Sequence, residues 1–235
     1  MNKEQFWNII DTARESGGSW TVMLEPLQDA LAKLEPQEIA GWYNIFSEYH
    51  AIADQELILG AAIYINNGIS DDGFIDFRSW LIAQGKEAYF NALLDPDSLA
   101  GLQAIRNFFA EVRATEYEPL NGYFNRPKFE AMIYAPLKAF EQKCGTAFDF
   151  YAYARKYQLK AQEATDLRSE IRFARNIDYS PRHRSSRSKA QQEYAMLFPR
   201  LTAALDKSNT LDAPSAPDQA SDTTPTAPKR RQRER

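Results

Sequence analysis

Apolar side chains recur three and four residues apart along most of the first 205 positions of this 235-residue chain. One stripe runs from Met23 to Leu34, and a second runs from Ile39 to Ala53. Residues at this spacing share one face of an α-helix, so each stripe predicts an amphipathic helix that buries that face. No segment has the alternating pattern of a strand, and we therefore expect an all-α fold.

Residues that break helices set the expected boundaries in the first half of the chain. Pro36 fits the first position of a helix, and Asn67, which precedes a glycine, is typical of a helix end. Asp95 precedes a Pro-Asp pair and has the character of a helix cap. It predicts a helix that runs from about Ser98 to Val112.

The second part of the chain is also expected to be helical. A long helix is predicted from Phe148 to about Asn176. A last helix contains Tyr194 and Leu205, although Pro199 between them lacks the N–H that a helix interior needs. From residue 208 onward Pro, Ala, Ser, Thr and Asp dominate. Such a segment buries too little apolar surface to offset its ordering entropy, so we expect a disordered C-terminal tail.

The net charge of −4 hides a strong asymmetry along the chain. Residues 1–120 carry 7 Lys and Arg against 19 Asp and Glu, whereas residues 121–207 carry 16 against 9. With the change in composition, this asymmetry predicts three units. They are a compact acidic helical domain over 1–115, a basic helical extension over 116–207, and the tail over 208–235. Whether the first two units share one core is left open.

Composition excludes several classes of protein. A single cysteine, Cys144, rules out a disulfide within the chain, and two distant histidines leave little material for a zinc site or a His-dependent triad. The longest apolar run has nine residues, from Leu57 to Ile65, whereas a membrane span needs roughly 20. The first residues also lack the apolar stretch of a secretory signal. We expect a cytoplasmic protein with no membrane contact and no cofactor.

The densest local motif runs from Ile69 to Gly85 and reads ISDDGFIDFRSWLIAQG. The stretch LLDPDSLA follows it and ends at Ala100. Together with the opening MNKEQFWNIID, these stretches resemble the bacterial domain of unknown function family 4240, over roughly residues 1–115. Ile69 stands where that family typically has Cys. The family has no established activity, so the resemblance implies a domain boundary rather than a function.

Three interpretations of this acidic motif are open. The candidate residues are Asp71, Asp72, Phe74, Asp76, Arg78 and Trp80. In the first, Asp71 or Asp72 caps a helix, and Arg78 returns to pair with one of them. In the second, Asp71, Asp72 and Asp76 bind Mg²⁺ or Ca²⁺, or supply acid–base chemistry, as the site of a metal-dependent enzyme. In the third, the motif is an acidic edge that binds a partner through an exposed Trp80 or Phe74.

The basic half offers a second candidate surface, over residues 155–189. Its candidate residues are Arg168, Arg172 and Arg175, at helical spacing, and Arg182, Arg184 and Arg187 in the loop that follows. They are interpreted as solvated or internally paired charges, as phosphate contacts to nucleic acid with neighbouring tyrosines stacking on bases, or as contacts to an acidic protein. The acidic half of the same chain is one such partner, which predicts that salt loosens the two halves.

These observations favour one functional hypothesis and leave two alternatives. The favoured hypothesis is a cytoplasmic, non-enzymatic protein-interaction module, because the sequence has no recognisable catalytic constellation and a strongly polarised charge distribution. The first alternative is a nucleic-acid-associated protein that uses the 155–189 surface. The second is a metal-dependent enzyme built on Asp71, Asp72 and Asp76. The oligomeric state is left open.

Overall fold

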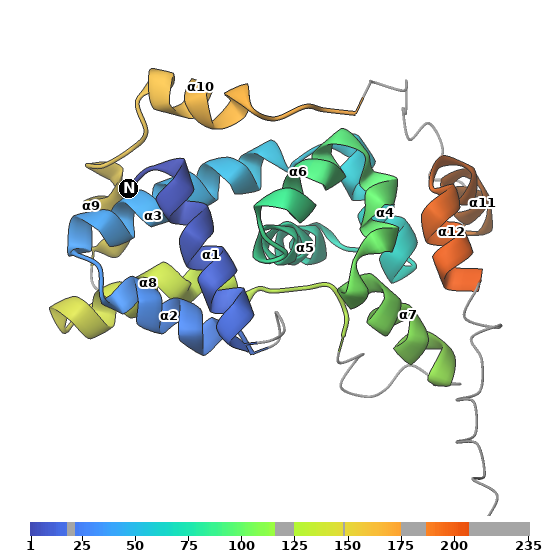
Figure 1. The fold of residues 1–235 in the computed structure, drawn as a ribbon, viewed down its shortest axis with the longest axis horizontal. Helices are drawn as coiled ribbons and strands as arrows, with labels where there is room; N and C mark the ends of the chain where they lie inside the picture. Colours follow the sequence, from blue (N-terminus) through green and yellow to red (C-terminus); the bar gives the residue numbers. More distant parts are fainter. Residues whose placement is uncertain (18–21, 116–124, 148, 175–186, 207–235) are drawn as a thin grey trace, which may run out of the picture.

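A computed structural model describes residues 1–17, 22–115, 125–147, 149–174 and 187–206, except for the side chains of 187–191. Within these residues the chain forms helices and no strand (Figure 1), which confirms the all-α prediction. The predicted disordered tail lies outside the described residues. In chain order the helices are α1 (Lys3–Gly17), α2 (Leu24–Ala32), α3 (Pro36–Ile52), α4 (Glu56–Asn66), α5 (Asp71–Ala83), α6 (Lys86–Leu94), the 3₁₀ helix η1 (Pro96–Gly101), α7 (Gln103–Ala114), α8 (Ala131–Cys144), α9 (Phe150–Arg155), α10 (Ala161–Ser169), α11 (Arg187–Leu197) and α12 (Pro199–Asp206).

Helix α5 lies at the centre of the molecule and is seen nearly end-on in Figure 1. It contacts α1, α3, α4, α6 and α8. Its residues from Phe77 to Ala83 are all buried, on every side of the helix. The acidic motif therefore begins at the surface and continues as the innermost helix of the fold.

Two groups of helices lie on opposite sides of α5 (Figure 1). Helix α8 lies along α2 and also contacts α3, and α9 packs on α3 (Figure 1). At the other end of the molecule, α11 packs on α4, and α12 packs on η1 and α7. Buried apolar residues from Phe6 to Leu201 belong to one hydrophobic cluster, which includes residues on both sides of position 115. The division into units at this position stays a prediction.

Local boundary signals are confirmed where the sequence carries them. Pro36 occupies the first turn of α3, and Asn67 adopts the left-handed conformation that ends α4. Ser70 is the N-cap of α5, and its hydroxyl accepts a hydrogen bond from the Gly73 N–H at 3.0 Å. The cap of this helix is therefore Ser70 rather than Asp71 or Asp72.

The predicted long helix from 148 to 176 is wrong. The described residues form two short helices, α9 and α10, and residues 171–174 have no helical structure. The Asn44 side-chain amide donates hydrogen bonds to the carbonyls of Ala154 and Tyr157, which satisfies acceptors at the end of α9. The Ala174 N–H donates to the carbonyl of Leu93 instead of continuing a helix. Both interactions come from distant parts of the chain and leave no local signal.

Two further predicted helices are each divided. The helix expected over 98–112 consists of η1 and α7, which are separated by the extended residue Leu102. The last helix consists of α11 and α12, and Pro199 is the first residue of α12, where its missing N–H has no consequence. None of the described helices is long and apolar enough to cross a membrane.

Candidate functional site

The acidic motif divides between the surface and the core. Asp71 and Asp72 are exposed in the first turn of α5, whereas Asp76, one turn further, is half-buried. Burial raises the pKa of the Asp76 carboxyl, and the nearby Glu130 and Asp72 carboxylates add to this effect, against Lys128. Among the described residues, no group of three or more His, Cys, Asp and Glu is arranged to hold a metal ion. The metal-dependent enzyme stays a prediction without a supporting geometry.

Arg78 and Trp80 are not surface residues of the motif. Trp80 is fully buried and Phe74 nearly so, which makes the interpretation of an acidic edge with an exposed aromatic wrong. Arg78 is also buried, and its guanidinium lies 4.8 Å from the centre of the Phe74 ring. Its Nη1 lies 3.3 Å from the Asp54 carboxylate and donates to the His50 carbonyl at 3.2 Å. The expected pairing of Arg78 with Asp71 or Asp72 is wrong, because its guanidinium pairs instead with Asp54, just after the end of α3.

The first arginine of the basic surface is paired within the chain. Arg168 donates from Nε and Nη2 to the Glu48 carboxylate, at 3.0 and 2.7 Å. Arg172 is exposed in the segment after α10, so it does not continue a helical stripe with Arg168. Arg175, Arg182 and Arg184 lie outside the described residues, and Arg187 lies in α11 without a described side chain.

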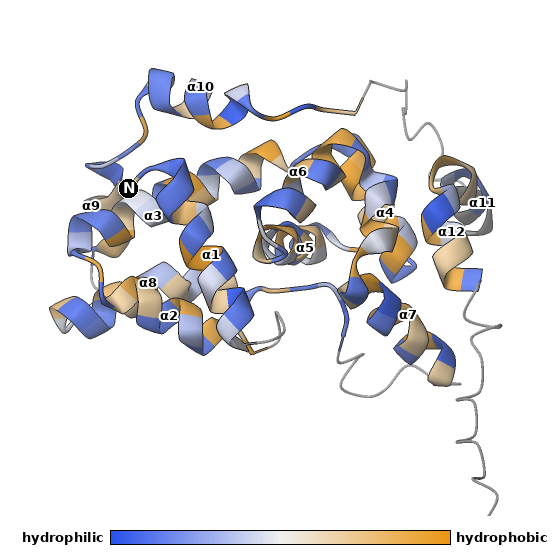
Figure 2. Ribbon diagram, viewed as in Figure 1, coloured by the Kyte–Doolittle hydropathy of each residue, from blue (hydrophilic) through white to orange (hydrophobic). Residues whose placement is uncertain are grey.

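The two oppositely charged parts of the chain contact each other through ion pairs of both polarities. Arg168 to Glu48 and Lys143 to Glu35 join a base from the basic part to an acid from the acidic part. Helix α10, which carries mostly hydrophilic residues in Figure 2, and Glu170, the residue that follows it, also place acids against bases of the first part. These reversed pairs are Lys3 with Asp166 and Glu170, and Lys86 with Glu170. The opposite net charges of the two parts therefore do not by themselves explain which ion pairs attach α10 to the rest of the fold.

A cluster of tyrosines forms the most distinctive exposed surface. We call it the tyrosine surface, and it consists of Tyr43 of α3, Tyr134 of α8, Tyr151 and Tyr153 of α9, and Tyr157. Tyr134, Tyr151 and Tyr157 are 44, 41 and 39% exposed. The Tyr151 ring packs edge-on against Tyr43, with ring centres 5.6 Å apart. Burial raises the pKa of the Tyr151 hydroxyl, and the neighbouring hydroxyls of Tyr43 and Tyr134 raise it further.

Buried aromatic residues pack beneath three of these rings, those of Tyr43, Tyr151 and Tyr153. Phe150, which is buried, contacts Tyr43, Phe140 and Tyr151, and Phe140 also contacts Tyr153. The hydroxyls of Tyr153 and Tyr157 lie 3.4 Å apart, and this hydrogen bond raises the pKa of Tyr153 to about 12. Tyr43 and Tyr134 were not predicted as part of a site, because they reach this surface from two other helices.

Two cations that pair with no described carboxylate border the tyrosine surface. Arg155 follows Tyr151 by one helical turn on α9 and is exposed. The Lys156 ammonium lies 5.9 Å from the centre of the Tyr153 ring. Within the described part of the chain, neither residue forms an ion pair, in contrast to Arg168 and Lys143. The arrangement presents aromatic rings and free positive charge on one face.

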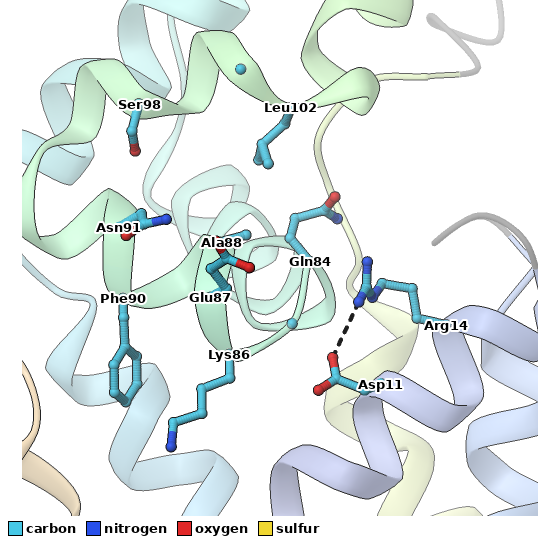
Figure 3. A pocket seen from close by; sticks show the side chains of 12 residues that line it. Asp11, Arg14, Gln84, Lys86, Glu87, Ala88, Phe90, Asn91, Ser98 and Leu102 are labelled. Atoms are coloured by element: carbon cyan, nitrogen blue, oxygen red, sulfur yellow. Dashed lines mark hydrogen bonds and ion pairs between the residues drawn. The ribbon is translucent and has the colours of Figure 1, made fainter.

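A polar pocket lies on another face, between α1, the start of α6 and η1 (Figure 3). Its volume is about 770 Å³. Asp11 and Arg14 of α1 are paired at 3.3 Å on one side, and Asn91 and Ser98 line the other. Gly85, with φ of +91°, is the N-cap residue of α6 and has no side chain that could cap the helix. The pocket is lined by acidic and basic side chains and by hydrogen-bond donors and acceptors, which suits a small polar molecule. No sequence motif predicted this pocket.

One comparison with known proteins gives a match. The family model described as "Protein of unknown function (DUF4240)" matches residues 1–142, which is more than half of the chain. The match confirms the resemblance expected over residues 1–115 and extends it through most of α8. No curated protein and no solved structure matches the chain.

Proposed function

The chain belongs to the DUF4240 family, and we propose that it is a non-enzymatic interaction module of the cytoplasm that binds an acidic protein through the tyrosine surface. The observation that carries this proposal is the set of exposed tyrosine rings beside Arg155 and Lys156, two cations without a carboxylate partner among the described residues. A family of unknown function adds no activity to this argument.

Exposed tyrosines support a protein partner. Tyr is enriched at protein interfaces, because its ring adds a large contact area while only two side-chain torsions must be fixed. Tyr43, Phe140 and Phe150 already contact the rings of Tyr151 and Tyr153, so little further ordering of these two rings is needed on binding. Tyr134 and Tyr151 are the expected anchors, since they are the two most exposed.

Charge decides which partner we propose. Arg168, Lys143 and Arg200 are paired with carboxylates of the chain, whereas Arg155 and Lys156 pair with no carboxylate in the part of the chain that the structure describes. Opposite charge on the partner steers its approach and fixes its orientation, and this effect weakens as salt increases. An acidic segment with an apolar contact for the two tyrosines matches both properties.

The test compares capture by the tagged full chain with capture by two double variants, in lysate of the native host at low salt, with and without nuclease. Tyr134→Ser with Tyr151→Ser removes the anchors. Leu94→Ser with Met196→Ser is the matched control, because these side chains are 47 and 84% exposed and lie outside the tyrosine surface. The retained protein is identified by mass spectrometry, purified and titrated against all three chains.

The proposal predicts an acidic protein that survives nuclease, binds the wild-type and control chains equally and binds the tyrosine variant at least tenfold more weakly. Equal binding to all three chains contradicts the proposal. Capture that depends on nucleic acid also contradicts it and favours the nucleic-acid alternative, in which the same tyrosines stack on bases.

A further inference from the structure

Asp97 accepts the first backbone hydrogen bonds of a helix that lies about 100 residues further along the chain. Its nearly buried carboxylate accepts the Leu201 N–H at 2.8 Å and the Arg200 N–H at 2.9 Å. The Arg200 side chain adds a hydrogen bond from Nε to Asp97 at 3.2 Å and an ion pair with Asp95. Asp97 therefore supplies to α12 the cap that a neighbouring side chain normally provides.

The sequence of α12 explains why this cap comes from outside. The residue before the helix is Phe198, whose side chain has no oxygen to accept an N–H. Pro199 at the first position has no N–H, so the amides of Arg200 and Leu201 are the first that need an acceptor. Asp97 satisfies both, and a negative charge at this end of a helix is also favoured by the helix dipole.

Apolar contacts complete the recognition. Phe198 and Leu201 are buried, and Phe198 approaches Gly60 of α4 so closely that a methyl group on Gly60 would lie 3.5 Å from its ring. The same methyl group would lie 3.2 Å from the Tyr194 ring. The Tyr64 hydroxyl forms a hydrogen bond of 2.8 Å with the Thr202 hydroxyl. We call Gly60, Tyr64, Asp95 and Asp97 the helix-docking surface.

The docking surface and its occupant belong to different parts of the chain. All four residues of the surface lie within the family match over 1–142, whereas α11 and α12 lie beyond it. We infer that the helix-docking surface is a second protein-binding site, and that its ligand is a helix. The first turn of this helix has the sequence Pro-Arg-Leu, and two aromatic residues spaced four apart precede it. Helix α12 is the resident occupant, and a partner helix with the same features displaces it.

This second site does not depend on the tyrosine surface. Its ligand is a basic, aromatic helix start, whereas the proposed partner of the tyrosine surface is acidic. Because α12 is attached to the domain, its effective concentration is high and it competes with any free helix. A free helix therefore binds measurably only when it is strong or when the contacts of α12 are weakened.

The test uses the full chain and a labelled peptide of residues 187–206 as the probe. Phe198→Ala with Arg200→Ala loosens the attached helix and leaves the docking surface intact. We expect the peptide to bind this loosened chain at least tenfold more tightly than the wild-type chain. Adding Asp97→Asn should weaken that binding at least tenfold, whereas adding Asp54→Asn, an exposed carboxylate elsewhere, should not change it.

A second measurement keeps the test decisive if the loosened chain does not fold. In a chain with the milder single change Arg200→Ala, which weakens the contacts of α12, excess peptide should speed amide hydrogen exchange in residues 199–206 by displacing α12, and a peptide with Arg200→Glu should not. An unchanged rate of amide exchange, or a peptide affinity that Asp97→Asn does not lower, overturns the inference. The wild-type chain could instead form a dimer at high concentration that Asp97→Asn abolishes. That result would contradict binding of a separate partner protein and would assign the surface to a second copy of the chain.

Discussion

Arg168 donates two hydrogen bonds to one carboxylate oxygen of Glu48, across 120 positions of the sequence. The basic stripe that the sequence offers as a nucleic-acid contact is thus partly used to attach α10 to α3. The Arg168 side chain is 55% exposed, so solvent screens the pair. We predict that Arg168→Ala lowers the free energy of unfolding by no more than about 1 kcal/mol, and that this loss shrinks as salt increases.

Urea unfolding of Arg168→Ala, Glu48→Gln and the double variant measures the coupling of this pair. Arg172→Ala is the control, because Arg172 is exposed and has no ion pair with a described residue. Additive effects of the two single changes, or an equal loss in Arg172→Ala, would contradict the assignment of Arg168 to an internal contact.

Arg78 should matter far more than its ion-pair partner. Arg78→Ala removes a buried stem, the contact to Phe74 and the donor to the His50 carbonyl, so we expect a loss of about 2–4 kcal/mol. Asp54 is 63% exposed, and Asp54→Ala should cost less than about 1 kcal/mol. Denaturant titration of both variants tests the difference. A loss on Asp54→Ala equal to that on Arg78→Ala would mean that the ion pair, rather than burial, holds Arg78.

Asp76 gives a pH dependence of stability with a defined sign. Its pKa in the fold is raised by burial, and then by Glu130, above the ordinary value of 3.8, so the folded chain favours the protonated carboxyl. The stabilising effect is complete below pH 3.8 and is lost as pH rises through the folded pKa. Asp76→Asn should therefore be more stable than the wild type at pH 7, with an advantage that shrinks toward pH 3.8.

Thermal unfolding from acid to neutral pH measures this difference for Asp76. Asp29→Asn, an exposed change on α2, is the control and should show no comparable trend. An advantage of Asp76→Asn that grows as pH falls would have the opposite sign and would contradict the account.

Substitutions at two glycines distinguish the cost of backbone strain from the cost of a steric clash. Gly85 and Gly145 both have positive φ, but a methyl group on Gly85 would lie 2.6 Å from Oδ1 of Asp11, whereas one on Gly145 would contact nothing within 4 Å. We expect Gly145→Ala to cost about 1–2 kcal/mol through strain alone. Gly85→Ala should cost more, because Asp11 must also move. Equal losses in thermal unfolding would show that the α1 contact at the pocket is unimportant.

The sequence predicted the features that are encoded locally. Pro36 and Asn67 mark helix ends because their own backbone preferences do so, whatever packs around them. The break after α9 could not be predicted, because Asn44 satisfies its carbonyls from a different helix. Periodicity also could not place Trp80 in the core, since it gives the faces of a helix but not which neighbours cover them.

The candidate sites were predicted less well than the fold. The acidic motif drew attention to Asp71 and Asp72, which remain exposed, whereas Asp97 accepts hydrogen bonds from a helix about a hundred positions away. The tyrosine surface joins Tyr43, Tyr134 and Tyr151 from three helices. Such convergence depends on tertiary packing and has no signature in a single sequence.

The salt dependence of the affinity between the chain and its captured partner decides whether the tyrosine surface binds an acidic protein. Titrations compare the wild type, Tyr134→Ser with Tyr151→Ser, and Arg155→Glu with Lys156→Glu. We predict at least tenfold weaker binding for each variant, and a salt dependence that is clear for the wild type and absent after charge reversal. Binding that neither variant weakens, or that strengthens on charge reversal, would contradict an acidic partner at the tyrosine surface.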